Sequence, residues 1–154
     1  MFLCLKIKSQ NKSYYFLNLF YNPKNQTLND LNDDTNKETV NEYMAAFRVS
    51  DHERILACLT DDIVWEMPGI YQHVGKKAFD KEIENENFVG SPIIHIIKLI
   101  EENNIVIAEG SVQGSMKNGG LLDAVFCDVF EMENGKIKKL TSYLMSKNAN
   151  LKFE

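Results

Sequence analysis

Arginine is scarce in this chain, and positive charge does not dominate it. Arg48 and Arg54 are the only arginines, and 17 basic residues stand against 22 acidic ones, for a formal net charge of -5. A protein that binds nucleic acid or polyphosphate needs a basic patch to neutralise phosphate groups. The sequence therefore predicts no nucleic-acid partner.

Cysteine is sparse as well. Cys4, Cys58 and Cys127 are too few for a disulfide framework, and no two of them have the spacing of zinc ligands. Other metal-ligating residues are scattered, and no glycine-rich phosphate loop is present. We expect neither a metal nor a cofactor, and a reducing, cytoplasmic location.

Long apolar runs are also missing. The longest, such as residues 14–17 and 93–97, fall far short of the roughly 20 residues that a membrane helix needs. Lys6, Lys8 and Lys12 interrupt the N-terminal segment, and no small-residue cleavage site follows it. We expect no membrane partner and no secretory signal.

What remains is the composition of one globular domain. The 154 residues are 44% hydrophobic and 25% charged, which fits a single ordinary core. Residues 1–35 lack glycine and show no sustained period, so they are expected to form a flexible, dispensable N-terminal extension, with an added strand or helix over 14–21 as the alternative. The domain is predicted over 36–147, followed by a tail over 148–154.

Helical signals begin at Thr35. Thr35 and Glu38 have the spacing of a capping box, and the apolar stripe that follows predicts a helix over 36–48. Ser50 and Glu53 repeat that spacing and predict a second, short helix. A helical hairpin should therefore open the domain.

The rest of the domain is rich in strands. A short strand over 63–65 should end at Pro68 and Gly69, and a third helix is predicted over 75–88. Asparagine and glycine turns then separate four β-branched segments, 93–102, 105–116, 121–133 and 136–146. The order ααβαββββ predicts an α+β fold in which a curved antiparallel sheet packs on helices as a cone and encloses a mostly apolar cavity.

These residues resemble the nuclear transport factor two-like (NTF2-like) superfamily, which includes ketosteroid isomerase and SnoaL-like polyketide cyclases. The resemblance covers about Thr35 to Ser146 and is specific as a set rather than at any single motif. The Trp-Glu-Met-Pro-Gly segment favours the SnoaL-like branch. The segments that carry the resemblance are Glu42 to Phe47, Leu59 to Gly69, Gly75 to Phe79, Cys127 to Glu131 and Asn134 to Ile137.

The resemblance to ketosteroid isomerase implies roles for three positions. Its oxyanion-hole tyrosine corresponds to Tyr43, which is followed by Met44 and two alanines, and its second donor, a carboxylic acid, corresponds to Asp128 in an Asp-x-Phe context. Its general-base aspartate corresponds to Met67, which has no proton to exchange. The resemblance thus implies a pair of hydrogen-bond donors without the base.

Strand alternation places Asp128 on one face with Phe126 and Phe130. A carboxyl group there should be desolvated and its pKa raised, as in the isomerase, which is itself a standard example of a neutral carboxylic acid that donates a hydrogen bond. The alternative is a structural hydrogen bond to a core tyrosine. The predicted ligand-binding residues of the cavity are Trp65, Met67, Phe126, Phe130, Leu140 and Ser142.

A substitute for the missing base is not evident from the sequence. His73 is expected in a loop near the cavity mouth, where it could transfer protons or be merely solvent-exposed. His95, Glu109 and Asp123 could face into the cavity or away from it, and Glu66 should point away from it. Tyr43, Asp128 and His73 are therefore the candidate catalytic residues.

Two interpretations of function stay open. One is a cofactor-independent isomerase, cyclase or dehydratase of SnoaL-like type that polarises a carbonyl group of a small apolar molecule. The other is a non-catalytic ligand-binding or structural module that lacks the base. Apolar residues on both faces of the last four strands also predict a homodimer through the outer face of the sheet.

Overall fold

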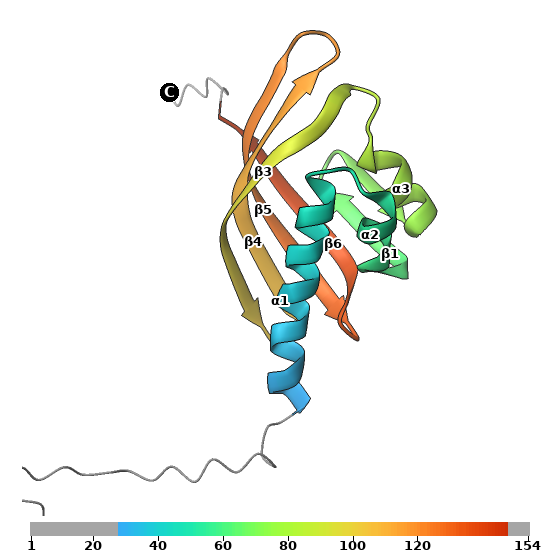
Figure 1. Cartoon of the computed structure of the whole chain (residues 1–154), viewed down its shortest axis with the longest axis vertical. Helices are drawn as coiled ribbons and strands as arrows, with labels where there is room; N and C mark the ends of the chain where they lie inside the picture. The colour runs from blue at the N-terminus through green and yellow to red at the C-terminus, as the bar shows by residue number, and fades with distance from the viewer. Residues whose placement is uncertain (1–27, 148–154) are drawn as a thin grey trace, which may run out of the picture.

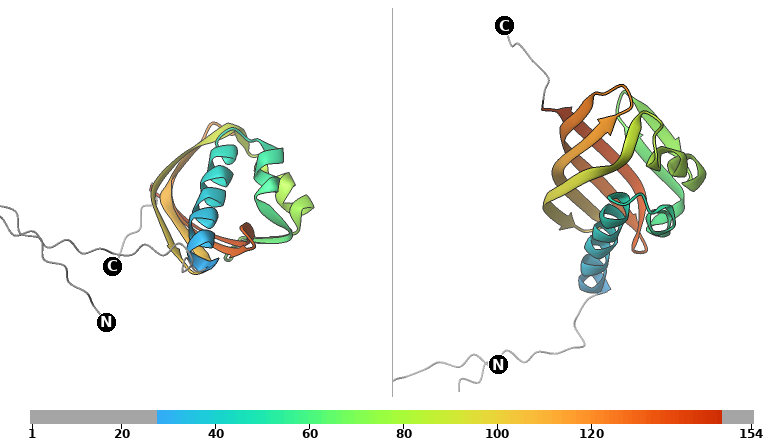
Figure 2. Two further views of the ribbon diagram at one scale, coloured as in Figure 1. Left: turned by 60° about the horizontal axis from the view of Figure 1, so that its bottom comes forward. Right: turned by 45° about the horizontal axis from the view of Figure 1, so that its top comes forward.

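The computed structural model describes the backbone of residues 28–147 and the side chains of residues 36–147. It confirms the α+β class, with a single six-stranded sheet in the order β2-β1-β6-β5-β4-β3. Helix α1 lies across the concave face of this sheet (Figures 1 and 2). The elements are α1 (Leu28–Phe47), α2 (His52–Ala57), β1 (Leu59–Met67), β2 (Tyr71–Val74), α3 (Lys76–Ile83), β3 (Phe88–Glu102), β4 (Ile105–Met116), β5 (Leu121–Glu133) and β6 (Lys136–Ser146).

Two features of the sheet differ from the sequence prediction. Strand β2 was not expected, and it pairs antiparallel with β1 in a hairpin. Strand β1 pairs in parallel with β6, so the sheet is mixed rather than wholly antiparallel. Both differences depend on which strands pair with each other, and local sequence patterns do not specify strand pairing.

Helix α1 begins at Leu28, upstream of the predicted start at residue 36. Thr35 therefore lies inside the helix, and the predicted capping box is not its N-terminus. Val40, Tyr43 and Met44 are buried on the stripe that the periodicity predicted. The expected extension thus shares residues 28–35 with this helix, while residues 1–27 and the predicted tail over 148–154 lie outside the described residues.

Polar contacts fasten α1 to the sheet. Asn36 is 2% exposed, and its Nδ2 atom donates a hydrogen bond to Glu101 Oε1 of β3 at 3.0 Å. Lys37 Nζ lies 3.9 Å from the other carboxylate oxygen of Glu101. Thr39 Oγ1 donates to the carbonyl oxygen of Gly135 at 2.8 Å, in the β5–β6 turn. These bonds fix the angle at which α1 crosses the concave face.

The short helix α2 has a different cap from the one predicted. Asp51, rather than Ser50, is its N-cap, and the Asp51 carboxylate accepts a hydrogen bond from the backbone N–H of Arg54 at 3.2 Å. Ser50 instead takes a left-handed conformation, with φ of 51°, just after α1 ends. The predicted capping box of Ser50 and Glu53 is therefore wrong, because Ser50 turns the chain and Asp51 caps the helix.

The four long strands follow their predicted bounds closely, with β3 starting earlier, at Phe88. Asn134 and Gly135 both have positive φ, as a two-residue primed turn requires. The third helix ends at Ile83, earlier than the predicted residue 88. None of the helices within residues 28–147 combines the length and the apolar character needed to cross a membrane.

The sheet is bent where β3, β4 and β5 meet. The register of β3 against β4 shifts between Ile96 and Lys98. A Cβ atom on Gly110 would lie 2.3 Å from the carbonyl oxygen of His95 and 2.5 Å from the Phe126 ring. Only glycine allows this approach, which lets Phe126 cover β4 on the inner face of the sheet.

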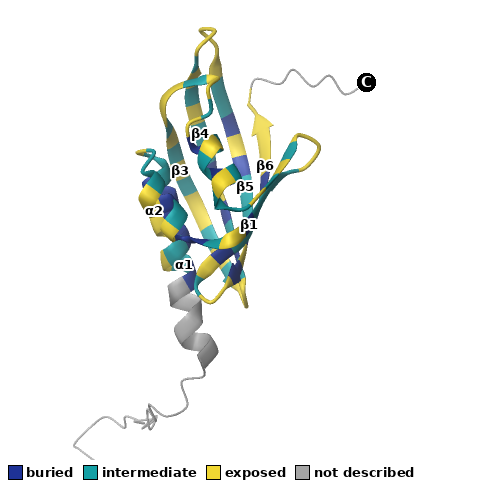
Figure 3. Cartoon of the chain, turned by 90° about the vertical axis from the view of Figure 1, so that its right-hand side faces the viewer, coloured by how far each residue is buried: buried dark blue, intermediate teal, exposed yellow. Residues whose placement is uncertain are grey.

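Burial divides the sheet into two faces (Figure 3). The inner face of β4, β5 and β6 carries the hydrophobic core, including Val106, Phe130 and Leu140, each at most 1% exposed. Phe79 and Ile83 attach α3 to this core. Core side chains therefore fill part of the concave side of the sheet, and a cavity occupies another part of it.

Candidate ligand-binding site

A cavity of about 750 Å³ lies between the concave face of the sheet and the helices. Helix α1 contributes Tyr43 and Phe47, the β1–β2 hairpin contributes Trp65 and Tyr71, and the sheet contributes Phe126 together with aliphatic residues. Most of the lining is apolar or aromatic, with a few polar groups among it. This is the usual composition of a small-molecule site.

Trp65 organises the aromatic part of the wall. Its ring centroid lies 4.7 Å from that of Phe79, 5.4 Å from that of Tyr71 and 6.3 Å from that of Phe47. The Tyr71 and Phe47 rings meet it edge to face, an arrangement that aromatic quadrupoles favour. Because neighbours from three elements hold Trp65, it offers a fixed surface to a flat ligand.

A series of hydrogen-bonded side chains runs from Trp65 through Ser142 to Asp128. Trp65 Nε1 donates a hydrogen bond to Ser142 Oγ at 3.2 Å. Ser142 lies opposite Asp128 in the β5–β6 pair, and the serine hydroxyl is hydrogen-bonded to the Asp128 carboxyl group. Because the Ser142 oxygen already accepts from Trp65, its own hydrogen is available for Asp128.

Burial dominates the titration of Asp128. Desolvation favours the neutral acid, and the hydrogen bond from Ser142 opposes it only in part, so the pKa of Asp128 is raised to about 7. The carboxyl group is therefore close to half protonated at neutral pH. It can donate a hydrogen bond when protonated and only accept one when ionised.

Tyr43 lies in the same cavity. Its side chain is 3% exposed and packs edge to face on Phe130, with the ring centroids 5.6 Å apart. Burial raises the pKa of Tyr43 well above its ordinary value, and the nearby charge of Asp128 raises it further. Tyr43 therefore remains a neutral hydroxyl donor across the physiological range.

The predicted ligand-binding residues divide into two groups. Trp65, Met67, Phe126, Leu140 and Ser142 all line the cavity, as do Tyr43 and Asp128. Phe130 does not line it; this side chain is fully buried beneath Tyr43 and supports the cavity floor. Met67 brings a thioether side chain to the cavity wall, and this group cannot accept a proton.

The prediction that His73 lies in a loop is wrong. His73 belongs to β2, where it pairs with Trp65, and its ring is 4.6 Å from that of Tyr71, centroid to centroid. Tyr71 lies on the cavity wall, whereas His73 is not among the lining residues. The extra strand thus places the histidine beside the wall rather than in the mouth.

The other polar candidates do not line the cavity. His95 is exposed on β3, and Glu109 pairs with Lys98 at 3.8 Å. Asp123 pairs with Lys147 at 3.0 Å, and Glu66 with Lys139 at 3.5 Å. In the described part of the chain, no three His, Cys, Asp or Glu side chains gather as metal ligands.

Several cavity residues were not anticipated from the sequence, and Tyr71 and Glu82 are the polar pair among them that matters most here. Burial raises the pKa of Tyr71 well above its ordinary value, and the charges of Glu82 and Asp128 contribute to the increase. The helical spacing offered a signal for Glu82, because it lies three residues after the buried Phe79 and next to Ile83. Tyr71 gave no such signal, since a four-residue strand carries little periodicity.

Comparisons with known proteins agree with this architecture. A family model described as "SnoaL-like domain" matches residues 40–140. An NTF2-like protein of unknown function from Burkholderia pseudomallei is 20% identical, with a TM-score of 0.66 over 72% of this chain and 91% of that chain. No curated protein matches the sequence significantly.

Two further solved structures resemble the chain. An LEH-like epoxide hydrolase from M. tuberculosis is 18% identical, with a TM-score of 0.66 over 73% of this chain and 84% of that chain. TerC, co-crystallised with polyporic acid, is 20% identical, with a TM-score of 0.65 over 72% of this chain and 92% of that chain. At such identities the likeness establishes a shared fold.

Proposed function

Because the chain belongs to the SnoaL-like domain family of the NTF2-like superfamily, we propose that it binds a small apolar molecule carrying a carbonyl or phenolic oxygen. Tyr43 and Asp128 donate hydrogen bonds to that oxygen, while Trp65 and its aromatic neighbours hold the ring system. The substrate class is an unsaturated or aromatic ketone, or its enol. No cofactor takes part.

One observation carries this proposal. Tyr43 and Asp128 line one apolar cavity, and they lie close enough that the charge on Asp128 adds to the raised pKa of Tyr43. Two hydroxyl-type donors that meet in a partly desolvated space stabilise negative charge that develops on a ligand oxygen. Such donors act more strongly there than in water because little solvent competes with them.

The order of events follows from these donors. The ligand oxygen lies between Tyr43 and Asp128, and both groups donate to it while Asp128 is protonated. Electron density then moves toward the oxygen, which makes the neighbouring C–H bonds more acidic. The hydrogen bond from Ser142 helps to orient the Asp128 carboxyl group.

A second candidate function is supported by Met67. Methionine at the position of the isomerase base cannot accept a proton, which favours a protein that binds and polarises its ligand without turning it over. The two functions share the donor pair and differ in whether another group supplies the base. Measurements of binding and of proton transfer therefore have to be made separately.

Binding of 2-naphthol, a flat phenol that imitates an enol, tests the donor pair. Fluorescence titration at pH 6 should show weaker binding to Tyr43→Phe and to Asp128→Asn, by about tenfold each if one hydrogen bond to a partly buried oxygen is lost. The double variant should lose less than the sum of the two losses in free energy, because both donors share one oxygen. Tyr143→Phe is the matched control, since Tyr143 is 52% exposed on the outer face. Unchanged affinity in both single variants would contradict the proposal.

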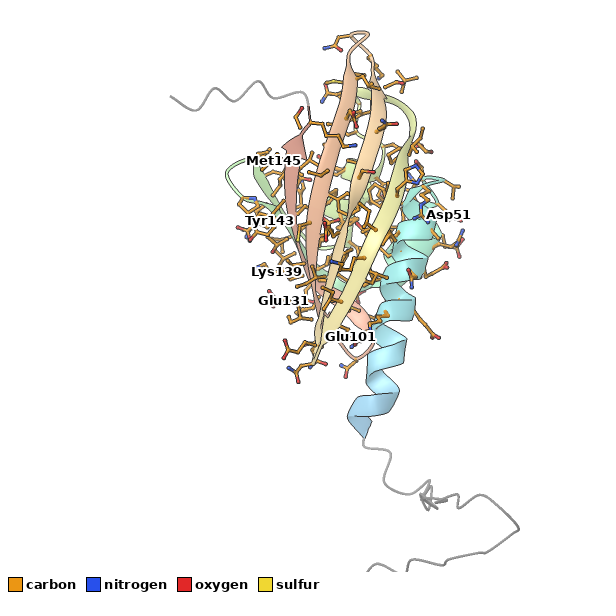
Figure 4. All side chains as sticks on the ribbon, turned by 90° about the vertical axis from the view of Figure 1, so that its left-hand side faces the viewer. Asp51, Glu101, Glu131, Lys139, Tyr143 and Met145 are labelled. Carbon is orange, nitrogen blue, oxygen red and sulfur yellow. The ribbon has the colours of Figure 1, made fainter. Side chains whose placement is uncertain are left out.

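We also propose that the chain forms a homodimer through the outer face of the sheet. Exposed apolar side chains gather there, including Ile97 at 67% and Met145 at 62% exposure. Figure 4 shows Tyr143 and Met145 on this face. A shallow groove of about 610 Å³ runs between these side chains. An apolar surface of this kind is costly to leave in water.

Opposite charges surround this apolar face. Lys98 pairs with Glu109, and Lys139 pairs with Glu131, so a second copy would meet both signs of charge. Sedimentation should give twice the 17.7 kDa chain mass, from an interface that buries at least about 1,000 Å². Val125→Glu should convert the dimer to a monomer that still binds 2-naphthol. A wild-type monomer at micromolar concentration would contradict this proposal.

The thiol groups fit a reducing, cytoplasmic setting, which we propose as the protein's location. Cys58 is buried and Cys127 half-buried, and both are free. Fractionation of cells that produce the protein, followed by alkylation of accessible thiols before lysis, tests this location. A protein recovered mainly outside the cytoplasm would contradict it.

A further inference from the structure

The donor pair alone cannot move a proton from carbon, so a catalytic site needs a base elsewhere on the cavity wall. Four acidic side chains lie on α3 and the segment that follows it. Asp80 is hydrogen-bonded to His52 at 2.6 Å, the Glu84 side chain is 71% exposed, and Glu86 is exposed. Glu82, Glu84 and Glu86 all line the cavity, but Glu82 differs from the other two because its side chain is only 26% exposed.

Both oxygens of the Glu82 carboxylate are positioned. Asn85 Nδ2 donates a hydrogen bond to Oε2 at 2.9 Å. His73 Nε2 lies 3.5 Å from Oε1, and this nitrogen is buried with no hydrogen-bond partner of its own. Tyr71 stacks on His73 and limits the motion of the imidazole ring. The carboxylate is thus held at the cavity wall by His73 of β2 and by Asn85, which follows α3.

Tyr71 connects this carboxylate to the donor pair. It lines the cavity, and both Glu82 and Asp128 contribute to its raised pKa, so both carboxyl groups lie within electrostatic reach of one phenol ring. A flat ligand whose oxygen lies at Tyr43 and Asp128 can extend along Trp65 and Tyr71 toward Glu82. The donors and the Glu82 carboxylate therefore belong to one continuous cavity wall.

We propose that Glu82 is the general base of this cavity, in place of Met67, and that His73 is a positioning residue for it. This inference rests on the proposed function of the donor pair. Glu82 removes a proton from a carbon next to the ligand carbonyl, and a new O–H bond forms on its carboxylate. The electrons of the broken C–H bond form the C=C bond of an enolate, whose oxygen carries the negative charge. Tyr43 and Asp128 stabilise that oxygen.

The proton then returns from Glu82 to carbon. Return to the same carbon gives exchange with solvent hydrogen, and return to a conjugated carbon gives a double-bond isomer. Neither outcome needs an oxidant, a reductant or a second substrate. The activity assigned to this site is therefore enolisation of an apolar ketone, with isomerisation when the ketone is unsaturated.

Hydrogen exchange of 2-tetralone in D2O, followed by proton NMR, tests this role directly. The wild-type protein should accelerate deuterium incorporation at the carbon next to the carbonyl above the buffer rate. Glu82→Gln should lower this acceleration by about 100-fold or more, the usual contribution of a general base. Glu53→Gln, an exposed glutamate on α2, should leave it unchanged.

The positioning role of His73 has its own measurement. His73→Asn should lower the exchange rate at saturating 2-tetralone and leave the half-saturating concentration within about twofold, since the histidine acts on the carboxylate rather than on the ligand. A purely structural histidine would change both quantities or change the unfolding midpoint. Urea unfolding of Glu82→Gln and His73→Asn shows whether either variant is misfolded.

Binding of 2-naphthol separates failure of this inference from failure of the proposed function. Glu82→Gln should bind 2-naphthol as the wild type does, because the donor pair is intact. Exchange at the buffer rate in the wild type, or wild-type exchange in Glu82→Gln, would overturn the role of Glu82 while leaving the donor pair standing. If Tyr43→Phe and Asp128→Asn both bound 2-naphthol as tightly as the wild type, the proposed function would be overturned instead.

Discussion

Asp128 and Ser142 lie opposite each other across the β5–β6 pair, and the serine hydroxyl is hydrogen-bonded to the carboxyl group on the cavity side of the sheet. The hydrogen bond lowers the pKa of Asp128, yet burial raises it more, to about 7. The cavity therefore contains an acid that changes its protonation near neutrality. Several measurable properties depend on that change.

Stability should depend on the protonation of Asp128. Its pKa of about 7 in the folded protein exceeds the roughly 3.9 of an unfolded aspartate. The folded state thus binds the extra proton, and this contribution is complete below about pH 4 and lost as the pH rises through 7. Asp128→Asn should be more stable than the wild type at pH 8 by up to about 4 kcal/mol.

Urea unfolding at pH 5, 6, 7 and 8, at one protein concentration, measures this difference. The difference in the free energy of unfolding between Asp128→Asn and the wild type should increase with pH and become constant above about pH 7. Asp123→Asn is a suitable control, because the ion pair with Lys147 lowers the pKa of Asp123 instead. Parallel pH profiles for wild type and Asp128→Asn would show that Asp128 titrates normally.

Ligand affinity should follow the same protonation. Between pH 6 and pH 8, the protonated fraction of a group with a pKa of about 7 falls by roughly tenfold. Binding of 2-naphthol should weaken over this range, because an ionised Asp128 can only accept hydrogen bonds and repels developing negative charge. Asp128→Asn should bind with nearly constant affinity below the ionisation of the phenol itself. A flat wild-type profile would rule out donation by Asp128.

Replacement of Gly110 should disrupt the bend of the sheet. In Gly110→Ala the new methyl group would lie 2.3 Å from the carbonyl oxygen of His95 and 2.5 Å from the Phe126 ring. Overpacking of this kind costs about 1–3 kcal/mol, and displacement of Phe126 should also weaken 2-naphthol binding. Gly114→Ala, whose new methyl would approach the Phe88 ring at 3.4 Å, is the control. Equal stability of the two variants would contradict the steric argument.

The contact between α1 and β3 should matter for stability. Asn36→Ala removes the hydrogen bond to Glu101, whose side chain is 1% exposed, and leaves a buried carboxylate with less compensation. We expect a loss of about 1–3 kcal/mol in the free energy of unfolding. Asn87→Ala, which removes the exposed hydrogen bond from Asn87 Nδ2 to Asn85 Oδ1, should cost less than about 0.5 kcal/mol. Similar losses in both variants would mean that the Glu101 contact contributes little.

Much of the fold follows from local patterns. The bounds of β4, β5 and β6 match those predicted, because turn residues such as Asn134 and Gly135 need positive φ and fix where each hairpin reverses. Strand alternation also identified the face that carries Phe126, Asp128 and Phe130. These features depend on neighbours within a few residues, so a single sequence is enough to predict them.

Other features depend on partners far along the chain. The start of α1, the strand β2 and the parallel pairing of β1 with β6 were not predicted. Strand β2 is short, and its hydrogen bonds come from β1 rather than from its own sequence pattern. His73 was expected in a loop, but as part of β2 it lies beside Glu82.

The sequence by itself determined that Tyr43 and Asp128 face the interior, because helix and strand periodicity depend only on backbone geometry. Tertiary structure decided how acidic Asp128 is, since burial by other elements raises its pKa and Ser142 of β6 lowers it. Tertiary structure also brought Glu82 of α3 to the cavity wall and His73 of β2 to its carboxylate. Electrostatic energies depend on distance and solvent access in space, and neither quantity can be read from spacing along a chain.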